Sequence, residues 1–260
     1  MSAPRTHARP AGDSAARAAA KETIWRLAAI ALGHPAPELQ KALESGAFHA
    51  ALNDAWLAVT GRAWPKRAPS VDFAALESGY IAAFLHGPKG KPVAPLLAGD
   101  HERLLAGHAR PVFMLNIAAF YRHFGLQAAE TDEGRADEPD HLASMLEFMA
   151  VLAHLEAQAL RRNRDPAAYR RAQRDFLRRY LCPLLRAVAD CLRGWPVESL
   201  DETIGQLVAD LPDWADHQAA ELEARVGRYR DPDAATAARV EGAQSRDTAA
   251  ARVVDQNLWG

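Results

Sequence analysis

The sequence has few cysteines and lacks a long apolar run. Its two cysteines, Cys182 and Cys191, are nine residues apart on one expected helix, where they point in different directions and do not suggest a disulfide. Two free thiols are typical of a reducing compartment. No stretch approaches the ~20 apolar residues that a membrane-spanning helix requires, and residues 1–20 lack the apolar centre of a signal peptide. We therefore expect a cytoplasmic protein without stable membrane insertion.

An excess of charge of either sign is also lacking. The chain has 31 Lys and Arg residues against 33 Asp and Glu residues, which argues against a nucleic-acid-binding protein. Its histidines are scattered and form no metal-binding tract. The sequence contains no G-x-S-x-G elbow and no H-E-x-x-H zinc motif, and "GPKGK" lacks the spacing of a phosphate-binding loop. We accordingly expect no enzymatic activity, no catalytic residues and no cofactor.

Strand signals are nearly absent, whereas helical patterns occupy most of the chain. Hydrophobic residues make up 49% of the sequence, enough to bury a core. Segments rich in Ala, Leu, Arg and Glu alternate with breaks that contain Gly and Pro. We predict an all-α, single-domain helical bundle without a β-sheet over residues 20–227, after a disordered arm at 1–19 and before a polar tail at 228–260. The expected helices cover roughly 15–32, 37–60, 71–86, 99–124, 138–163, 166–193 and 197–227.

The helix expected from residue 138 has a broad apolar arc and a polar side formed by Glu147, His154 and Gln158. Such an arc is typical of a helix that packs against several neighbours, so this helix should be central to the bundle. The apolar side contains Leu142, Met145, Leu146, Met149, Leu152, Ala153 and Leu160, widened by Phe148 and Leu155.

The helix expected at 166–193 has clear start and break signals. Asp165 and Pro166 fit the N-cap and the first helical position. Pro183 should kink this helix in its middle, because proline removes a backbone donor and clashes with the preceding turn.

The segment "DEPDH" at 137–141 admits several interpretations. It can simply start a helix, with Asp137 as the cap, Pro139 in the first turn, and Asp140 near unpaired N–H groups. Glu138 and His141 also have the E-x-x-H spacing of di-iron bundle proteins. Such a site needs two of these pairs and further glutamates, whereas this chain has one, so we expect no metal site.

A further interpretation is a binding surface. Residues 130–140 contain six acidic residues and one arginine, Arg135, next to a helix with a wide apolar arc. Carboxylates pair well with arginine, and a helix lying in an apolar groove is a common form of peptide recognition. The matching ligand has arginines followed by an apolar run, which is the composition of a bacterial twin-arginine export signal.

These residues also carry a family resemblance. Glu138, Pro139, Asp140 and His141, followed by "LASMLEFMAVL", resemble the signature of the TorD/DmsD/NarJ family of maturation chaperones for molybdenum oxidoreductases, an E-P-D-H element that opens a helix. The segments "YIAAFLHGP", "FYRHFGL" and "WRLAAIALGHPAPELQKAL" resemble other parts of this family, so the resemblance covers roughly residues 20–195. The chain departs from the family pattern at "KGKPVAPLLAG" and lacks the tryptophan that often follows "FLRRYLCPLL". These departures leave the subgroup open between reductases of dimethyl sulfoxide, trimethylamine oxide, nitrate, selenate or chlorate and dehydrogenases of hydrocarbons or dimethyl sulfide, and we lean toward the last, less aromatic group.

The resemblance implies a TorD-like helical bundle that acts as a cytoplasmic chaperone. Its partners would be the apo catalytic subunit of a molybdopterin oxidoreductase and the twin-arginine signal peptide of that subunit. The chaperone would keep this subunit ready for cofactor insertion before export. We expect a monomer or weak homodimer that binds no nucleic acid. The alternatives are a helical, di-iron-like metal-binding enzyme and a generic helical adaptor that binds a folded partner regardless of its leader.

The expected client groove lies between 138–141 and the segment 80–88. Asp140 and His141 should lie at its rim, unless they instead clamp two helices together. The apolar contacts are expected from Tyr80, Phe84 and Leu85, of which Phe84 and Leu85 are equally compatible with the core. The complete set of expected client-binding residues is Tyr80, Phe84, Leu85, Gly87, Pro88, Glu138, Pro139, Asp140 and His141.

Overall fold

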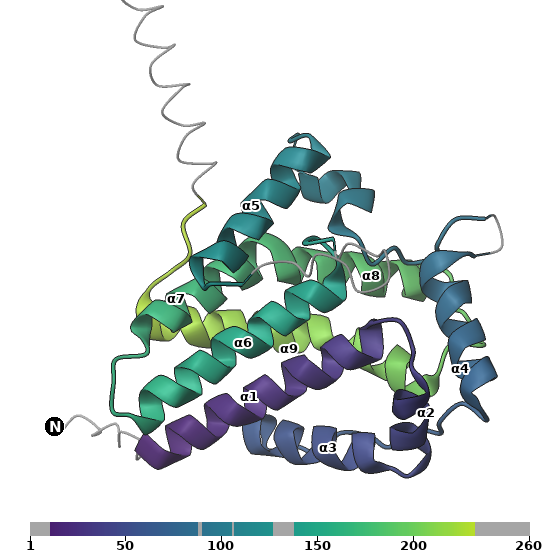
Figure 1. The fold of residues 1–260 in the computed structure, drawn as a ribbon, viewed down its shortest axis with the longest axis horizontal. Helices are drawn as coiled ribbons and strands as arrows, with labels where there is room; N and C mark the ends of the chain where they lie inside the picture. The colour runs from purple at the N-terminus through teal and green to yellow at the C-terminus, as the bar shows by residue number, and fades with distance from the viewer. Residues whose placement is uncertain (1–10, 88–89, 106, 127–137, 232–260) are drawn as a thin grey trace, which may run out of the picture. The chain divides into compact units, whose positions relative to one another are not determined.

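The computed structural model describes residues 11–87, 90–105, 107–126 and 138–231, and they form an all-α fold, as predicted (Figure 1). Across these residues no β-sheet forms, and a single β-bridge joins Leu97 to His141. No helix in the described part of the chain is long and apolar enough to cross a membrane. The α-helices are α1 (Ala11–Leu32), α2 (Pro37–Glu44), α3 (Ala47–Thr60), α4 (Phe73–Tyr80), α5 (Arg110–His123), α6 (Leu142–Arg161), α7 (Ala167–Phe176), α8 (Cys182–Gly194) and α9 (Glu202–Val226). They are joined by the π-helical turns η1 (Ile81–Leu85) and η4 (Leu177–Leu181) and the 3-10 turns η2 (Ala98–Asp100) and η3 (Glu102–Leu105).

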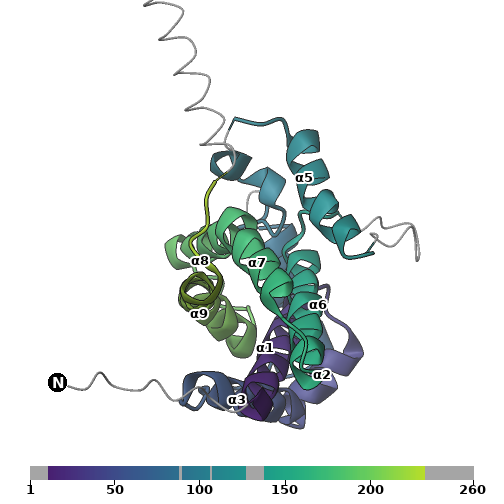
Figure 2. The same cartoon turned by 90° about the vertical axis from the view of Figure 1, so that its left-hand side faces the viewer.

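Helix α6 is central, as its broad apolar arc predicts. It runs beside α1, its most extensive helical neighbour, and also contacts α7 and η4 (Figures 1 and 2). Small buried residues on both helices, such as Ala28 of α1 and Ala153 of α6, let the two backbones approach closely. Figure 2 shows α3 and α5 on opposite sides of this helical core. The fold therefore holds the start of α6 against the end of α1.

Two aromatic clusters fill the core. Trp214 of α9 lies between Trp25 of α1 and Trp56 of α3, with ring centroids 4.3 and 5.6 Å away. On the other side of α6, Phe148 contacts Tyr121 of α5 and Phe176 of α7, with both ring centroids 4.8 Å away. Each large aromatic side chain buries much apolar area, so these clusters fix α3 and α5 to the central pair.

Several expected helices differ from the structure. The helix expected at 37–60 is broken at Gly46, whose φ of 76° is left-handed and separates α2 from α3. The helix expected at 99–124 begins only at Arg110, because Gly107 has a φ of 83° and Pro111 fits the first turn of a new helix. Helix α1 starts at Ala11, so residues 11–19, expected in the arm, are helical.

The interruption expected at Pro183 is present in a different form. Instead of a simple kink, the π-helical turn η4 precedes this proline, which lies in the first turn of α8. A π turn leaves room for the ring because it widens the preceding backbone. The start of α7 is shifted by one residue from the prediction, because Pro166 and not Asp165 is the N-cap residue. Asp165 precedes it and accepts a hydrogen bond from the backbone N–H of Ala167 at 2.9 Å.

Partly buried ion pairs connect the helices outside the apolar core. Glu221 of α9 pairs with Lys21 of α1 at 3.0 Å and with Arg17 of α1 at 3.5 Å. Burial alone would raise the pKa of Glu221, but Lys21, Arg17 and Arg225 together lower this pKa to about 2. Glu221 therefore stays ionised at neutral pH and links α9 to α1.

Candidate functional site

A cavity of about 660 Å³ lies where α1 ends, α6 begins and α4 passes into η1. We call it the motif cavity, because Glu138 and His141 of the "EPDH" segment line it together with Tyr80 and Leu85. The structure therefore brings together the two segments between which a client groove was predicted. The other lining residues are Ala29, Ile30, Gly33, His34, Ala36, Glu38, Leu39, Leu97, Ala143, Ser144 and Glu147.

His141 sets the start of α6. Its Nδ1 accepts a hydrogen bond from the backbone N–H of Ala143 at 3.2 Å, which makes His141 the N-cap residue. The helix therefore begins at Leu142 and not at residue 138, and Asp137, the expected cap, lies outside the described residues. The imidazole stands at the cavity wall because the cap holds it at the mouth of the helix.

Asp140 is not at the rim, so its expected position is wrong. Its side chain is fully buried, and its Oδ2 accepts a hydrogen bond from the backbone N–H of Gly99 at 2.8 Å. The backbones of the 96–99 and 140–142 segments are also paired. Ala98 N–H donates to the carbonyl of Asp140 at 3.0 Å, and Leu142 N–H donates to the carbonyl of Leu96 at 2.8 Å. Asp140 thus acts as a clamp on the 96–99 segment, which brings Leu97 to the cavity, and this differs from the clamp between two helices that was the alternative.

The residues expected on the 80–88 segment have different environments. The Tyr80 hydroxyl donates to the carbonyl of Leu32 at 3.2 Å, while its ring lines the cavity. Phe84 is buried against Tyr80, with ring centroids 5.1 Å apart, and belongs to the core. Leu85 is 38% exposed and lines the cavity. Gly87 pairs with Lys91 through their backbones at 2.8 Å, and Pro88 lies outside the described residues.

Pro139 and Glu138 connect the motif to α5. The carbonyl of Pro139 accepts a hydrogen bond from the Tyr121 hydroxyl at 2.7 Å. Burial first, and then the nearby charge of Asp140, raise the pKa of Tyr121, so this hydroxyl remains a donor. Glu138 accepts a hydrogen bond from Arg110 at 2.6 Å. Pro139 therefore contributes through its backbone, whereas Glu138 presents a carboxylate at the cavity.

The cavity combines acidic and apolar groups. Glu38, Glu138 and Glu147 line it, and His34 lies 3.6 Å from a fourth carboxylate, that of Glu77. Two large exposed hydrophobic residues, Ile30 at 48% and Leu85 at 38%, stand at the same opening. The arrangement can bind a ligand that carries both positive charge and apolar surface. Sequence reasoning missed Ile30, Glu38 and Leu97, because nothing local marks them as neighbours of the motif.

Within the described residues, no group of three or more His, Cys, Asp or Glu side chains is placed to hold a metal ion. Glu138 and His141 share the cavity, but the carboxylate of Glu138 bonds to Arg110 and Nδ1 of His141 caps α6. Both members of the E-x-x-H pair thus have structural partners.

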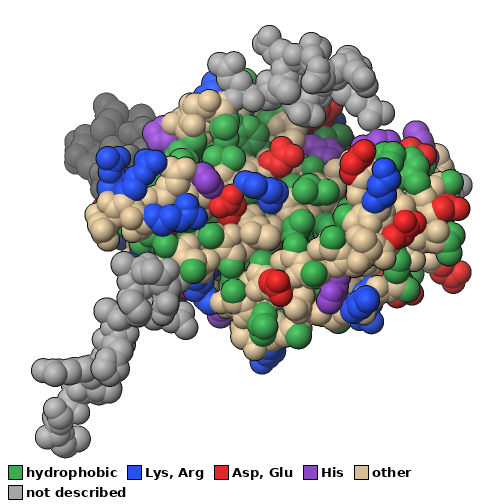
Figure 3. All heavy atoms as spheres, turned by 60° about the horizontal axis from the view of Figure 1, so that its bottom comes forward, with side chains coloured by type: hydrophobic (Ala, Val, Ile, Leu, Met, Phe, Trp, Pro, Cys, Tyr) green, Lys and Arg blue, Asp and Glu red, His purple; other side chains and the backbone are tan. Residues whose placement is uncertain are grey.

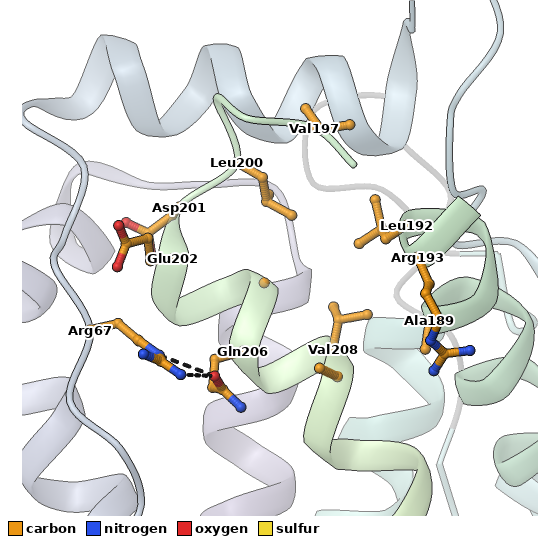
Figure 4. Close-up of a pocket in the computed structure, with 12 residues that line it drawn as sticks. Arg67, Ala189, Leu192, Arg193, Val197, Leu200, Asp201, Glu202, Gln206 and Val208 are labelled. Atoms are coloured by element: carbon orange, nitrogen blue, oxygen red, sulfur yellow. Dashed lines mark hydrogen bonds between the residues drawn. The ribbon is translucent and has the colours of Figure 1, made fainter. Parts of the chain in front are cut away.

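A second cavity, about 530 Å³ in volume, has a different character (Figure 4). We call it the α8–α9 groove. Leu192, Val197, Leu200 and Val208 supply apolar surface. Arg67 and Arg193 stand on its opposite sides, and Arg67 is hydrogen-bonded to Gln206 (Figure 4). None of the predicted site residues lies here.

The surface also differs in charge from end to end. Figure 3 shows basic side chains gathered at the left-hand end of one face and several acidic ones toward its right-hand end. The stretch 161–164 at the end of α6 is exposed and contains three arginines. The acidic cavity thus lies on a molecule that is not uniformly acidic.

A helical bundle with a charged and apolar cavity is suited to binding a ligand, and the comparisons with known proteins assign the chain to a family. Residues 33–190 match the family model described as nitrate reductase delta subunit. The chain belongs to this family, the TorD/NarJ family, and the resemblance stated from its motifs is confirmed.

Several relatives are assembly chaperones. The chain is 51% identical to the dimethyl sulfide dehydrogenase assembly chaperone protein of Rhodovulum sulfidophilum, over 99% of this chain and 97% of the relative. It is 38% identical to the selenate reductase assembly chaperone protein of Thauera selenatis, over 45% and 57% of the two chains. It is also 33% identical to the perchlorate reductase assembly chaperone protein of Dechloromonas aromatica, over 65% and 77%. No solved structure matches the chain. The protein thus belongs to a family of assembly chaperones, which are not enzymes.

Proposed function

We propose that the motif cavity binds the N-terminal twin-arginine leader of the client's catalytic subunit before export. The observation that carries this proposal is the meeting of Glu38, Glu138 and Glu147 with exposed Ile30 and Leu85 around one opening. A leader of this kind has arginines next to an apolar run. The arginines would pair with the carboxylates, and the apolar run would cover the exposed side chains.

The chaperone would hold the apo subunit in the cytoplasm while the molybdopterin cofactor is inserted, and then release it. Release requires moderate affinity. Micromolar binding corresponds to about −8 kcal/mol and nanomolar binding to about −12 kcal/mol, and we expect values nearer the first. Holding the leader also keeps it from the export machinery until the cofactor is in place.

The proposed client is a dehydrogenase of the dimethyl sulfide type. The 51% identity over nearly the whole of both chains supports this choice, and the departures from the family pattern lean toward the same subgroup. We propose that the chaperone binds it as a monomer or weak homodimer.

The test is calorimetric titration of the purified protein with the leader peptide of a dimethyl sulfide dehydrogenase catalytic subunit. We expect saturable binding that weakens when both leader arginines are replaced by alanine. The double variant Glu138→Gln, Glu147→Gln should weaken binding while leaving the helical circular dichroism signal unchanged. A generic adaptor would instead bind the folded client equally well after deletion of its leader, and that result would reject the leader site.

A further inference from the structure

Arg110, the first residue of α5, bridges two carboxylates beside the motif cavity. Its Nη2 lies 2.6 Å from Oε2 of Glu138, and its Nη1 lies 3.3 Å from Oδ1 of Asp100. The aliphatic stem of Arg110 passes directly over Gly99: a Cβ added to this glycine would lie 2.5 to 2.9 Å from Nε, Cδ and Cγ of Arg110. Gly99 is held in turn by Asp140. The position of the guanidinium is thus set by the clamp that forms the cavity.

The Arg110–Glu138 ion pair is partly exposed to solvent beside the motif cavity. The Arg110 side chain is 35% exposed and that of Glu138 is 43% exposed, so solvent screens the pair and it adds little to stability. Glu138 is also a wall residue of the motif cavity. A weak, exposed ion pair that occupies a ligand-facing carboxylate is better explained by a role in binding than by a role in folding.

We propose that Arg110 is an internal competitor for Glu138, which a client arginine must displace. This inference rests on the proposed function of the motif cavity. In the free protein the Arg110 guanidinium is paired with the carboxylate of Glu138. When a leader arginine binds, the ion pair between Arg110 and Glu138 breaks, and Arg110 remains paired with Asp100, to which it is already close. One guanidinium replaces another, so both carboxylates remain paired and the exchange is readily reversed.

The exchange also selects for arginine over lysine. A guanidinium has a planar fork that matches a carboxylate, whereas the ammonium group of lysine is a compact and more strongly hydrated charge. A leader lysine is therefore a poorer competitor against the resident arginine. Removing Arg110 should tighten binding in general, and it should reduce the preference for arginine in particular.

The first experiment measures the affinity of Arg110→Gln for the twin-arginine leader and for its twin-lysine variant by calorimetry. Because an exposed pair is weak, we expect binding of the arginine leader to tighten by about three- to sixfold and the lysine leader to gain more. The matched control is Arg122→Gln, which removes an exposed charge from the same helix without touching Glu138 and should leave both affinities unchanged.

Two further variants isolate the contact itself. Gly99→Ala pushes the Arg110 stem aside while keeping its charge, and it should tighten leader binding in the same direction. In a Glu138→Gln background, Arg110→Gln should give no additional gain, because the contested carboxylate is gone. If Arg110→Gln proves too unstable to measure, Gly99→Ala decides the question.

The outcomes separate this inference from the proposed function. Suppose that the unmodified protein binds the leader and that Arg110→Gln binds it with equal or lower affinity and the same preference for arginine. This result overturns the competitor role and leaves the leader site standing. Equal gains from Arg110→Gln and Arg122→Gln also overturn it, since they would reflect overall charge. Absence of leader binding by both the unmodified protein and Arg110→Gln would remove the proposed function itself.

Discussion

The motif cavity and the α8–α9 groove are built in opposite ways. The walls of the motif cavity come from segments far apart in sequence, around residues 29–39, 80–97 and 138–147, and they include three glutamates. The groove is formed mostly by the continuous stretch 189–209, with Arg67 and Arg193 at its sides. The family match covers residues 33–190, which includes nearly all of the motif cavity and little of the groove. The contrast favours the motif cavity as the seat of the function that the family shares.

The largest expected effect comes from filling the motif cavity. Ser144, on the first turn of α6, lines this cavity and is partly exposed. The variant Ser144→Trp should weaken leader binding by at least about thirtyfold, the loss typical of a binding hot spot, because the indole occupies the ligand space. The matched variant Val197→Trp fills the groove and should change affinity little. Calorimetry on both variants checks this, and a stronger loss from Val197→Trp would assign the leader to the groove.

The next effect is a loss of folding stability when the buried Asp140 beside the motif cavity is replaced, compared with the exposed Arg193 at the side of the groove. Asp140→Ala removes the buried acceptor for Gly99 N–H and should reduce the free energy of unfolding by about 1–3 kcal/mol. Asp140→Asn keeps an acceptor and should lose less. Arg193→Ala, at the exposed side of the groove, should stay within about 0.5 kcal/mol of the parent. Urea unfolding followed by circular dichroism measures all three, and equal stability of Asp140→Ala and the parent would contradict the clamp.

Acid pH separates loss of folding from loss of binding. The pKa of Glu221 is lowered to about 2, so its stabilising ion pairs are fully present above pH ~5 and are lost as the pH falls toward 2. After allowance for solvent screening, Glu221→Gln should lose about 1–2 kcal/mol at pH 7 and show a flatter acid-unfolding profile. Thermal unfolding between pH 7 and pH 2.5 tests this, and an unchanged profile would contradict it. A change in leader affinity above pH 5 then reflects binding at a cavity and not the loss of the Glu221 ion pairs.

The smallest effect is a gain in stability from a substitution at Gly205, which lines the groove. Gly205 lies in α9, and a Cβ added there would meet only Leu200 Cδ2, at 3.9 Å. Gly205→Ala should therefore raise the free energy of unfolding by about 0.5–1 kcal/mol, through helix propensity. Leader affinity should stay the same. Urea unfolding and calorimetry check both expectations, and weaker leader binding by this variant would show that the groove contributes to recognition.

The sequence allowed the fold to be predicted where local pattern governs it. The apolar spacing from Leu142 to Ala153 identified α6 as a central helix, and the proline and glycine breaks placed most helix ends. Gly46, which has a left-handed conformation, was missed as a break because an isolated glycine inside a helical pattern is often tolerated. Pro183 signalled an interruption, but whether the backbone kinks or forms a π turn is settled by tertiary packing.

The candidate site was predictable only in part, for a similar reason. The segments 80–85 and 138–141 were correctly expected to lie together. The position of Asp140 was wrong, because its partner Gly99 is 41 residues away in the chain and no local pattern links them. Arg110 is 28 residues from Glu138 and was missed on the same grounds. The acidic stretch 130–137 lies outside the described residues, so its expected role stays a prediction.

The π-helical turn at Ile81–Leu85 makes the opening of the motif cavity depend on chain length. His86 N–H reaches the carbonyl of Ile81 at 2.7 Å, and the carbonyl of Ala83 instead accepts from Ala94 N–H at 2.9 Å. Such a turn contains one more residue than an α-helical turn. Deleting a single codon here would restore a regular helix, rotate Leu85 by about 100° away from the opening, and break the tie to Ala94. Insertion or deletion of one residue can thus reshape this opening without replacing any of its carboxylates.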